Sequence, residues 1–186
     1  MYDYWLWDNA LPKWFCEQQI ANISWDDKMD GSVHRKDGYV VDKDVRITDL
    51  VWQDQHSPLG CIAQIYINMA NEKAGWNFNL STLLSGIQIG RYRGEENGFY
   101  NWHADDTLKP NNDGLLRKLS ISILLSDEHS FEGGVFEFKG FEDENQPKLK
   151  QGSIIVFPSL LEHRVTPVTS GDRYSAVTWV SGPAYR

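Results

Sequence analysis

GSIIVFPSLLEHRVTPVTSGDRYSAVTW, residues 152–179, is the stretch that decides the fold. It carries closely spaced runs of Ile, Val, Phe, Thr and Tyr separated by Pro and Gly, a pattern typical of antiparallel β-strands. The runs in and just after it are 153–157, 162–168 and 173–181. The stretch therefore predicts a β-rich domain, with His163 on one strand and Arg173 on the next.

The same texture continues upstream of this stretch. Further β-prone runs lie at 76–80, 85–92, 99–105, 117–125 and 134–139. About eight short strands bounded by Gly, Asn, Asp and Pro predict a double-sheet barrel or a jelly roll. We expect this core to cover about residues 85–182.

The first half of the chain has a different texture. Apolar residues at helical spacing predict one amphipathic helix over about 11–22 and a second from Pro58 to about Lys73, with Gly75 as its stop. We expect these helices, within about residues 1–80, to cover one face of the sheets. The predicted fold class is therefore mainly β (α+β), in a single domain over 1–186.

Composition agrees with one globular domain. A chain of 186 residues can bury roughly 70% of its unfolded surface, which is enough for a core. Trp, Tyr and Phe each occur eight times, which suits aromatic packing in a β-rich shell. No internal repeat and no Pro/Gly/Ser linker divides the sequence, so the changes of texture are changes of secondary structure.

The net charge argues against some classes of partner, and the two cysteines argue against a disulfide-bonded protein. The formal net charge is -8 and Lys and Arg do not cluster, so we expect no nucleic-acid partner and no binding to an anionic membrane surface. Cys16 and Cys61 lie far apart in apolar segments, unlike a disulfide framework. With no signal sequence and no apolar run long enough to span a bilayer, the expected location is cytoplasmic.

A candidate set of metal ligands lies in two motifs. His103 and Asp105 stand two residues apart in FYNWHADD, so an extended strand points both side chains to the same face. His163 can complete a set of two imidazoles and one carboxylate, which is typical of non-haem Fe(II) sites. A His-x-Asp alone is a weak signal, but a later His with an Arg ten residues beyond it is much rarer.

Strand parity bears on Arg173. A three-residue turn at 169–171 would place Arg173 on the same interior face as His163. An inward arginine needs an anion, and its planar fork suits a carboxylate ligand. An internal ion pair with an acidic residue of the chain is the alternative. The inward set after the turn would be Arg173, Ser175, Val177 and Trp179.

These motifs carry a family resemblance. The runs YRGEENGFYNWHAD, LSISILLSD, FEGGVFEF and GSIIVFPSLLEHRVTPVTSGDRYSAVTW follow one another in order and resemble the prolyl 4-hydroxylase-type 2-oxoglutarate/Fe(II)-dependent dioxygenases. Within that group they look most like the bacterial PKHD-type hydroxylases. The resemblance covers about residues 85–182 and implies a jelly-roll core there, that is, a cupin-like double-stranded β-helix, whereas the N-terminal helices carry no specific motif.

The resemblance implies roles for the residues that match by position. The implied catalytic and iron-binding residues are His103, Asp105 and His163. The implied cofactor-binding residues are Arg173, which holds the C5 carboxylate of 2-oxoglutarate, Ser175 beside it, and Tyr92 and Tyr100 along the pocket.

The chain departs from the family pattern at one position. Some relatives place a tyrosine hydroxyl against the C5 carboxylate from the LSISILLSD strand, and the equivalent residue here is Leu124. Ser122 or a water is the expected substitute. Gly133 and Gly134 match a glycine pair of the family, but an ordinary hairpin turn accounts for them equally well, so we assign them no chemistry.

The implied activity is hydroxylation of a C–H bond with Fe(II), 2-oxoglutarate and dioxygen, releasing succinate and CO2. Ascorbate is expected to sustain this activity. A prolyl residue of a peptide or protein is the leading substrate, and a free amino acid or other small molecule is the alternative. We expect substrate choice to lie in the loops 30–45, 93–99 and 106–116, because loops on a rigid scaffold often carry specificity.

Two other classes of protein stay open at this point. A jelly roll with the same three ligands could bind a metal or small acid without turnover, or use zinc for hydrolysis. Alternatively, some tryptophans could form a binding surface, although aromatics interleaved with apolar residues are more often core. These tryptophans are Trp5, Trp7, Trp14 and Trp102. The histidines predicted to lie in solvent are His34, His56 and His129.

Overall fold

The structure is a computed structural model that describes residues 2–35, 38–81, 86–106 and 108–184. Two α-helices lie in the first half of the chain, α1 (Lys13–Ala21) and α2 (Pro58–Lys73). The 3-10 turns are η1 (Gly94–Glu96) and η2 (Asp143–Asn145). The strands are β1 (Trp5–Trp7), β2 (Met29–Asp30), β3 (Ser32–Arg35), β4 (Gly38–Val41), β5 (Arg46–Ile47), β6 (Asp49–Gln53), β7 (Ile87–Arg93), β8 (Phe99–His103), β9 (Leu115–Leu124), β10 (Phe131–Gly133), β11 (Phe136–Phe138), β12 (Ile154–Pro158), β13 (His163–Val165) and β14 (Val168–Pro183).

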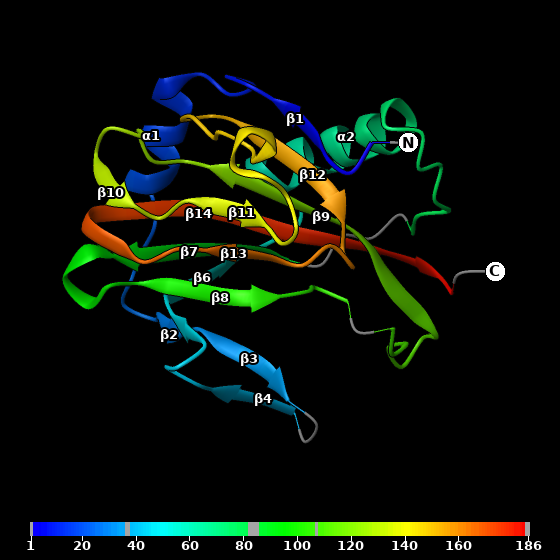
Figure 1. Cartoon of the computed structure of the whole chain (residues 1–186), viewed down its shortest axis with the longest axis horizontal. Helices are drawn as coiled ribbons and strands as arrows, with labels where there is room; N and C mark the ends of the chain where they lie inside the picture. Colours follow the sequence, from blue (N-terminus) through cyan, green and yellow to red (C-terminus); the bar gives the residue numbers. More distant parts are fainter. Residues whose placement is uncertain (1, 36–37, 82–85, 107, 185–186) are drawn as a thin grey trace.

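Most of these strands form two antiparallel sheets. The larger sheet has the order β1-β12-β9-β14-β7-β6-β2, with β10 beside β14. The smaller sheet has the order β11-β13-β8-β5, and β3 pairs with β4 in a separate hairpin. Figure 1 shows this hairpin at the lower end of the molecule and both helices at the upper end. The predicted mainly β fold with a double-sheet core and supporting helices is confirmed.

The longer helix, α2, follows its sequence signals closely. Ser57 caps its start, because the hydroxyl accepts a hydrogen bond from the backbone N–H of Gly60 at 3.3 Å, and Pro58 opens the first turn. The chain leaves the helix at Gly75, whose φ of +75° suits glycine. The second predicted helix and its stop are therefore confirmed, and the first is confirmed as α1.

Apolar side chains gather on both faces of the larger sheet. One cluster joins the inner faces of the helices to the outer face of the sheet, with Leu59 and Ile67 of α2 against Ile121 and Ile123 of β9. The other cluster lies between the two sheets and is rich in aromatic residues, among them Phe138 and Phe157. The helices therefore seal one face of the larger sheet and leave the space between the sheets for a site.

The predicted strand at 76–80 is wrong. Asn77 has a φ of +50°, and the Asn71 side chain makes two 2.9 Å hydrogen bonds with the backbone of Phe78. These side-chain bonds take the place of a strand partner. For the next predicted strand, 85–92, residue 85 lies outside the described residues and β7 begins at Ile87.

The predicted turn at 169–171 is also wrong. Strand β13 pairs with β8 and β11, whereas β14 starts at Val168 and pairs first with β10, so 169–171 lies inside a strand. Gly171 has a φ of +68°, and a Cβ there would lie 2.1 Å from the carbonyl oxygen of Ser130. The chain changes sheets between β13 and β14, which the parity of a simple hairpin does not describe.

Three further expectations concern membrane-spanning helices, the cysteines and the tryptophans. Within the described part of the chain, neither helix is long and apolar enough to cross a membrane. Both cysteines are free, with Cys16 buried and Cys61 exposed. Trp5 and Trp7 pack against the core, whereas Trp14 is exposed, so these tryptophans occupy different environments.

Candidate metal and carboxylate site

A cavity of about 770 Å³ lies between the two sheets. The smaller sheet contributes side chains from β8 and β13, and the larger sheet contributes side chains from β7, β9 and β14. Alternate residues of β14 line it, namely Arg173, Ser175, Val177, Trp179 and Ser181. The first four are the inward residues predicted from strand parity, although 169–171 lies inside β14 and does not form the turn invoked for them.

The three predicted metal ligands lie together at this cavity. His103 is the cross-strand partner of His163. One carboxylate oxygen of Asp105 lies 3.7 Å from Nε2 of His103, and the other lies 3.6 Å from Nε2 of His163. One candidate ligand atom from each residue lies within 4.8 Å of the other two. Residues widely separated in sequence thus form one compact cluster.

Strand β8 ends at His103, two residues before the predicted end. The backbone N–H groups of Asp105 and Asp106 both donate to the carbonyl oxygen of Ser159, at 2.9 and 3.0 Å. The chain therefore leaves the sheet to meet the turn after β12. This turn holds the backbone of Asp105 beside the two histidines.

Backbone carbonyls fix the tautomer of both imidazoles. Nδ1 of His103 lies 2.8 Å from the carbonyl oxygen of Asn101, and Nδ1 of His163 lies 2.9 Å from that of Leu161. A carbonyl oxygen can only accept, so each Nδ1 carries a proton, and in the neutral ring the lone pair is therefore on Nε2. Burial and the neighbouring His163 lower the pKa of His103 to about 3, so its ring is neutral near pH 7. Both rings can therefore act as ligands through Nε2.

Hydrogen bonds also orient the Asp105 carboxylate. The hydroxyl of Ser120 donates to Oδ2 of Asp105 at 2.7 Å and lies 2.9 Å from the hydroxyl of Ser159. Burial alone raises the pKa of Asp105, but the two histidines and the hydrogen bonds from Ser120 and Trp179 outweigh it, so the pKa lies below its ordinary value. The carboxylate is therefore ionised and held in place.

This donor set fits a divalent iron ion. Two imidazole nitrogens and one carboxylate on one face of a metal are the ligands of non-haem Fe(II) oxygenases, and they leave three positions open. Metal–ligand bonds of about 2.0–2.2 Å place adjacent ligand atoms of an octahedral ion roughly 3 Å apart. Each histidine Nε2 lies within 3.7 Å of one Asp105 oxygen, and one donor atom from each residue lies within 4.8 Å of the other two, so the three side chains must close in slightly to meet these distances.

Arg173 is buried in the same cavity without an acidic partner. Its side chain is 2% exposed, its Nη1 donates to the Ser175 hydroxyl at 3.2 Å, and its Nε has no hydrogen-bond partner. Burial lowers the pKa of Arg173 from its ordinary value. No carboxylate among the described residues pairs with it, so the alternative of an internal ion pair has no support within them. A buried fork of this kind is suited to an anionic ligand.

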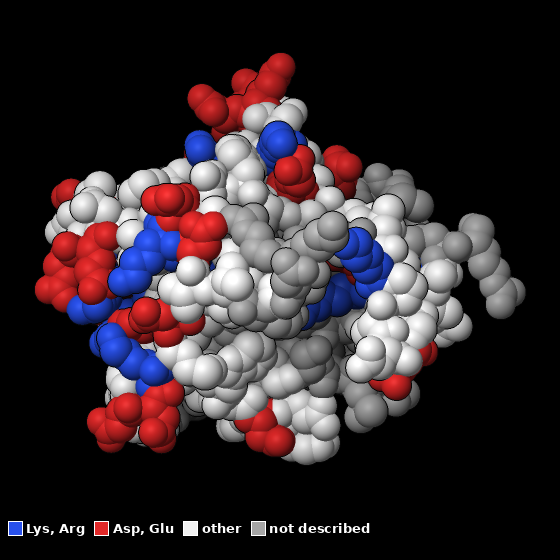
Figure 2. Space-filling model, turned by 90° about the horizontal axis from the view of Figure 1, so that it is seen from below, with Lys and Arg blue, Asp and Glu red and all other residues white. Residues whose placement is uncertain are grey.

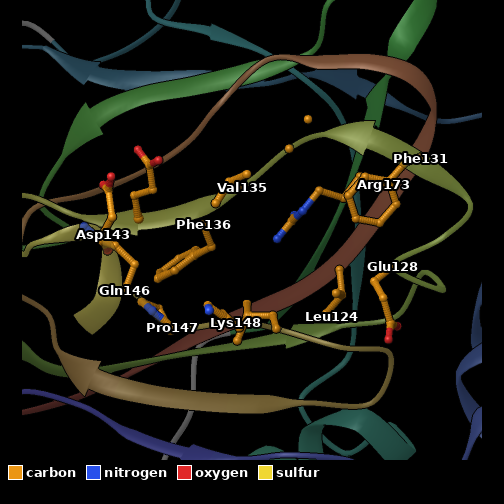
Figure 3. A pocket seen from close by; sticks show the side chains of 14 residues that line it. Leu124, Glu128, Phe131, Val135, Phe136, Asp143, Gln146, Pro147, Lys148 and Arg173 are labelled. Carbon is orange, nitrogen blue, oxygen red and sulfur yellow. The ribbon is translucent and has the colours of Figure 1, made fainter.

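Arg173 also reaches a second cavity of about 490 Å³. Figure 3 shows its guanidinium pointing into the middle of this cavity, between Phe136 and Leu124. The carboxylates of Glu128 and Asp143 point away from it (Figure 3). Arg173 thus lines both cavities.

The tyrosines and Leu124 have distinct positions around these groups. Tyr100 stacks on the ring of His103 with 3.5 Å between ring centroids, and burial raises the pKa of Tyr100 to about 12. Tyr92 is the cross-strand partner of Arg173 and lies under its guanidinium at 5.5 Å. Leu124 is the cross-strand partner of Ser175 and lines the second cavity together with Arg173. An apolar side chain therefore occupies the position at which the family pattern led us to look for a hydroxyl.

A sequence model for the 2OG-Fe(II) oxygenase superfamily matches residues 87–181, just over half of the chain. The chain belongs to this superfamily. The matched range includes His103, Asp105, His163 and Arg173.

Curated relatives are similar in sequence to part of this 2OG-Fe(II) oxygenase. A PKHD-type hydroxylase of Synechococcus sp. (strain CC9605) is 37% identical over 105 residues, which are 56% of this chain and 45% of that protein. A PKHD-type hydroxylase of Shewanella oneidensis is 36% identical over 93 residues, which are 50% of this chain and 41% of that protein. The match thus spans less than half the length of each relative.

Solved structures share the fold over nearly the whole chain. A viral collagen prolyl hydroxylase from Paramecium Bursaria Chlorella virus-1, in a 2OG complex, has a TM-score of 0.67 and 19% identity and covers 97% of both chains. A Pseudomonas putida prolyl-4-hydroxylase has a TM-score of 0.70 and 17% identity, and the match covers 100% of this chain and 95% of that one. At these identities the likeness shows a common fold.

Sequence reasoning missed two residues that form hydrogen bonds with Asp105, namely Ser120 and Arg117. Ser120 supports Asp105, and its signal was the alternation of Ser120 and Ser122 within an otherwise apolar strand. Arg117 also escaped notice; its guanidinium lies 4.2 Å over the ring of Trp179 and donates to the backbone carbonyl of Asp105 at 3.2 Å. No periodic pattern marks Arg117, because its partners come from other parts of the chain.

Proposed function

We propose that this chain is a 2-oxoglutarate/Fe(II)-dependent dioxygenase that hydroxylates a C–H bond of a prolyl residue in a peptide or protein. One observation carries the proposal. A buried arginine without an acidic partner, Arg173, lines the same cavity as the cluster of His103, Asp105 and His163. A metal site alone would not require that arginine, whereas a dicarboxylate co-substrate would use it.

In this proposal each group has one role. His103 and His163 bind Fe(II) through Nε2, and Asp105 binds it through its carboxylate. Arg173 and Ser175 bind the C5 carboxylate of 2-oxoglutarate, with Tyr92 beneath the guanidinium and Tyr100 against the His103 ring. The whole chain acts as a single domain, in which the helices on the outer face of the larger sheet stabilise the walls of the cavity.

The bound iron would supply an oxidant derived from dioxygen, with one oxygen atom entering the substrate C–H bond and the other entering succinate as 2-oxoglutarate loses CO2. The protein's part is to orient the reactants and to limit the access of water. Phe136, Phe157 and Val165 provide apolar walls beside the histidines, and Trp179 contacts Asp105. Ascorbate is expected to sustain activity over many turnovers.

The prolyl substrate is supported by names of similar proteins. The curated relatives are called PKHD-type hydroxylases, and the structural neighbours are called prolyl hydroxylases. A free amino acid or other small molecule is the second candidate. Succinate formation with a panel of Pro-containing peptides and free amino acids, with the site of hydroxylation located by mass spectrometry, decides between them.

The co-substrate role has a direct spectroscopic test. Anaerobic protein with Fe(II) and 2-oxoglutarate should show the weak visible charge-transfer band of the chelate. Arg173→Ala should lose this band at 2-oxoglutarate concentrations that saturate the wild type. The matched control is Arg164→Gln, because Arg164 lines neither cavity and is paired with Glu137 at 2.6 Å. Folded wild-type protein that shows no band would overturn the proposal.

A further inference from the structure

A second arginine, Arg46, is buried at the same cavity. It lies on β5 at the edge of the smaller sheet and is 5% exposed. Cross-strand pairing places it at the end of a row of side chains that line the cavity. From one edge of the smaller sheet to the other, this row is Phe136, Val165, Tyr100 and Arg46.

The hydrogen-bonding capacity of Arg46 is largely unused. Its Nη1 donates to the carbonyl oxygen of Ser32 at a long 3.4 Å, and its Nε has no partner. Its guanidinium lies 4.4 Å over the ring of Tyr100. Within the part of the chain that the structure describes, no carboxylate pairs with Arg46.

Other arginines of the chain, in contrast to Arg46, form ion pairs with carboxylates. Arg91 donates to Asp49 at 2.7 Å, and Arg164 donates to Glu137 at 2.6 Å. Among the described residues the buried arginines are Arg46 and Arg173, and both line the cavity without an acidic partner. Burying an unpaired charge is costly, so a position of this kind points to an anion that comes from outside the chain.

The two arginines approach the metal cluster from different sheets. Arg173 comes from β14 of the larger sheet, whereas Arg46 comes from β5 of the smaller sheet. The guanidinium of Arg46 covers Tyr100, and Tyr100 covers His103. An anion on Arg46 would therefore lie near the metal without occupying the place of the 2-oxoglutarate tail on Arg173.

The surrounding chain makes room for this arginine and adds positive charge. A Cβ on Gly31 would lie 2.7 Å from Nε of Arg46, so only glycine leaves the guanidinium its present place. Lys109 and Arg117 also line the cavity. On the face seen in Figure 2, basic and acidic atoms intermingle at the left, while right of centre a group of Lys and Arg atoms has few acidic atoms around it.

We propose that Arg46 binds a carboxylate of the hydroxylated substrate, so that the cavity has two carboxylate subsites, one for 2-oxoglutarate and one for the substrate. This inference rests on the proposed function and narrows its substrate class to compounds with a carboxylate near the reacting carbon. The carboxylate can be the terminus of an amino acid or peptide, or an acidic side chain next to the hydroxylated residue.

The test compares acids with their amides in protein loaded anaerobically with Fe(II) and 2-oxoglutarate. Binding is followed by tryptophan fluorescence, because Trp52, Trp102 and Trp179 line the cavity. The terminal-carboxylate arm uses the N-acetyl derivatives of Pro, Leu, Phe and Lys against their amides. The side-chain arm uses acetyl-Pro-Glu-amide against acetyl-Pro-Gln-amide. We expect an acid of one arm to bind about tenfold more tightly than its neutral partner.

Arg46→Gln should abolish this difference between acid and amide while the charge-transfer band of the Fe(II) and 2-oxoglutarate chelate stays intact. Arg164→Gln, which removes an arginine stacked 4.5 Å over Trp102, should keep the difference. A purely structural role for Arg46 would weaken acid and amide equally and overturn the inference. Two further results would do the same: no preference for acids in either arm, or loss of the band in Arg46→Gln. Absence of the band in the wild type would instead contradict the proposed function.

Discussion

Gly134 and Arg173 are in direct contact, and the contact depends on the absence of a side chain at Gly134. A Cβ on Gly134 would lie 2.8 Å from Cδ of Arg173, and the glycine has a φ of +59°. The glycine pair at 133–134 is therefore more than a hairpin turn. It lets the backbone pass close to the side chain that we propose binds 2-oxoglutarate.

Gly134→Ala should weaken 2-oxoglutarate binding. The new Cβ would push the Arg173 stem out of place, and the positive φ would cost about 1–2 kcal/mol in stability. Titration of the charge-transfer band with 2-oxoglutarate measures the first effect. Gly140→Ala is a matched control, because Gly140 also has a positive φ of +83° but no atom within 4 Å of an added Cβ. Equal affinity of the two variants for 2-oxoglutarate would contradict the proposed role of the contact.

Ser120→Ala should lower the affinity for Fe(II) by about 10- to 100-fold, because it removes the 2.7 Å hydrogen bond that orients Asp105. A competition titration with a metal chelator measures this change. Ser126→Ala serves as the control, since Ser126 is buried and hydrogen-bonded to Tyr174 outside the cavity. If both variants bound iron as the wild type does, Ser120 would have no part in the site.

His163→Ala should remove iron binding, because it deletes one of the two imidazole ligands. His129→Ala should leave the iron content unchanged, since the His129 side chain is 87% exposed and lies outside the cavity. Metal analysis of both proteins after dialysis against Fe(II) under anaerobic conditions provides the measurement. The reverse outcome would show that the ligand assignment is wrong.

Leu59→Ala should destabilise the fold by about 2–5 kcal/mol, because it opens a cavity where α2 packs against the larger sheet. Ile65→Ala on the same helix should change the free energy of unfolding by less than about 1 kcal/mol, because its side chain is 57% exposed. Urea unfolding of the two variants gives both values. A similar loss in both would mean that α2 does not cover the sheet as described.

Much of the fold could be predicted because its signals are local. The helical spacing from Pro58 to Lys73 and the period-two pattern of β9 and β14 are written in contiguous residues. The very short strands of the first half escaped prediction, since β2 and β5 have two residues each and depend on their sheet partners. Short segments of this kind are strands only because neighbours supply their hydrogen bonds.

The candidate site was likewise predictable only where its signals are local. His103, Asp105, His163 and Arg173 could be named from spacing and family resemblance, and strand alternation correctly placed Arg173 toward the interior. The hairpin used to justify that placement is wrong, since β13 pairs with β11 and β8 and not with β14. A strand as short as β13 carries no local signal of which strands it pairs with. His163 and Arg173 lie on different sheets, and the packing of the two sheets brings them to one cavity. Alternation along a single strand cannot describe this arrangement.

By itself, the sequence determined the type of most elements, the candidate metal ligands and the superfamily, because each depends on nearby residues or on a recognisable order of motifs. Tertiary structure alone decided which groups support them: Ser120 on Asp105, Gly134 beneath Arg173, and Arg46 over Tyr100. These contacts join segments 15 to 54 residues apart. They arise only when two twisted sheets close around a common cavity, which no local pattern encodes.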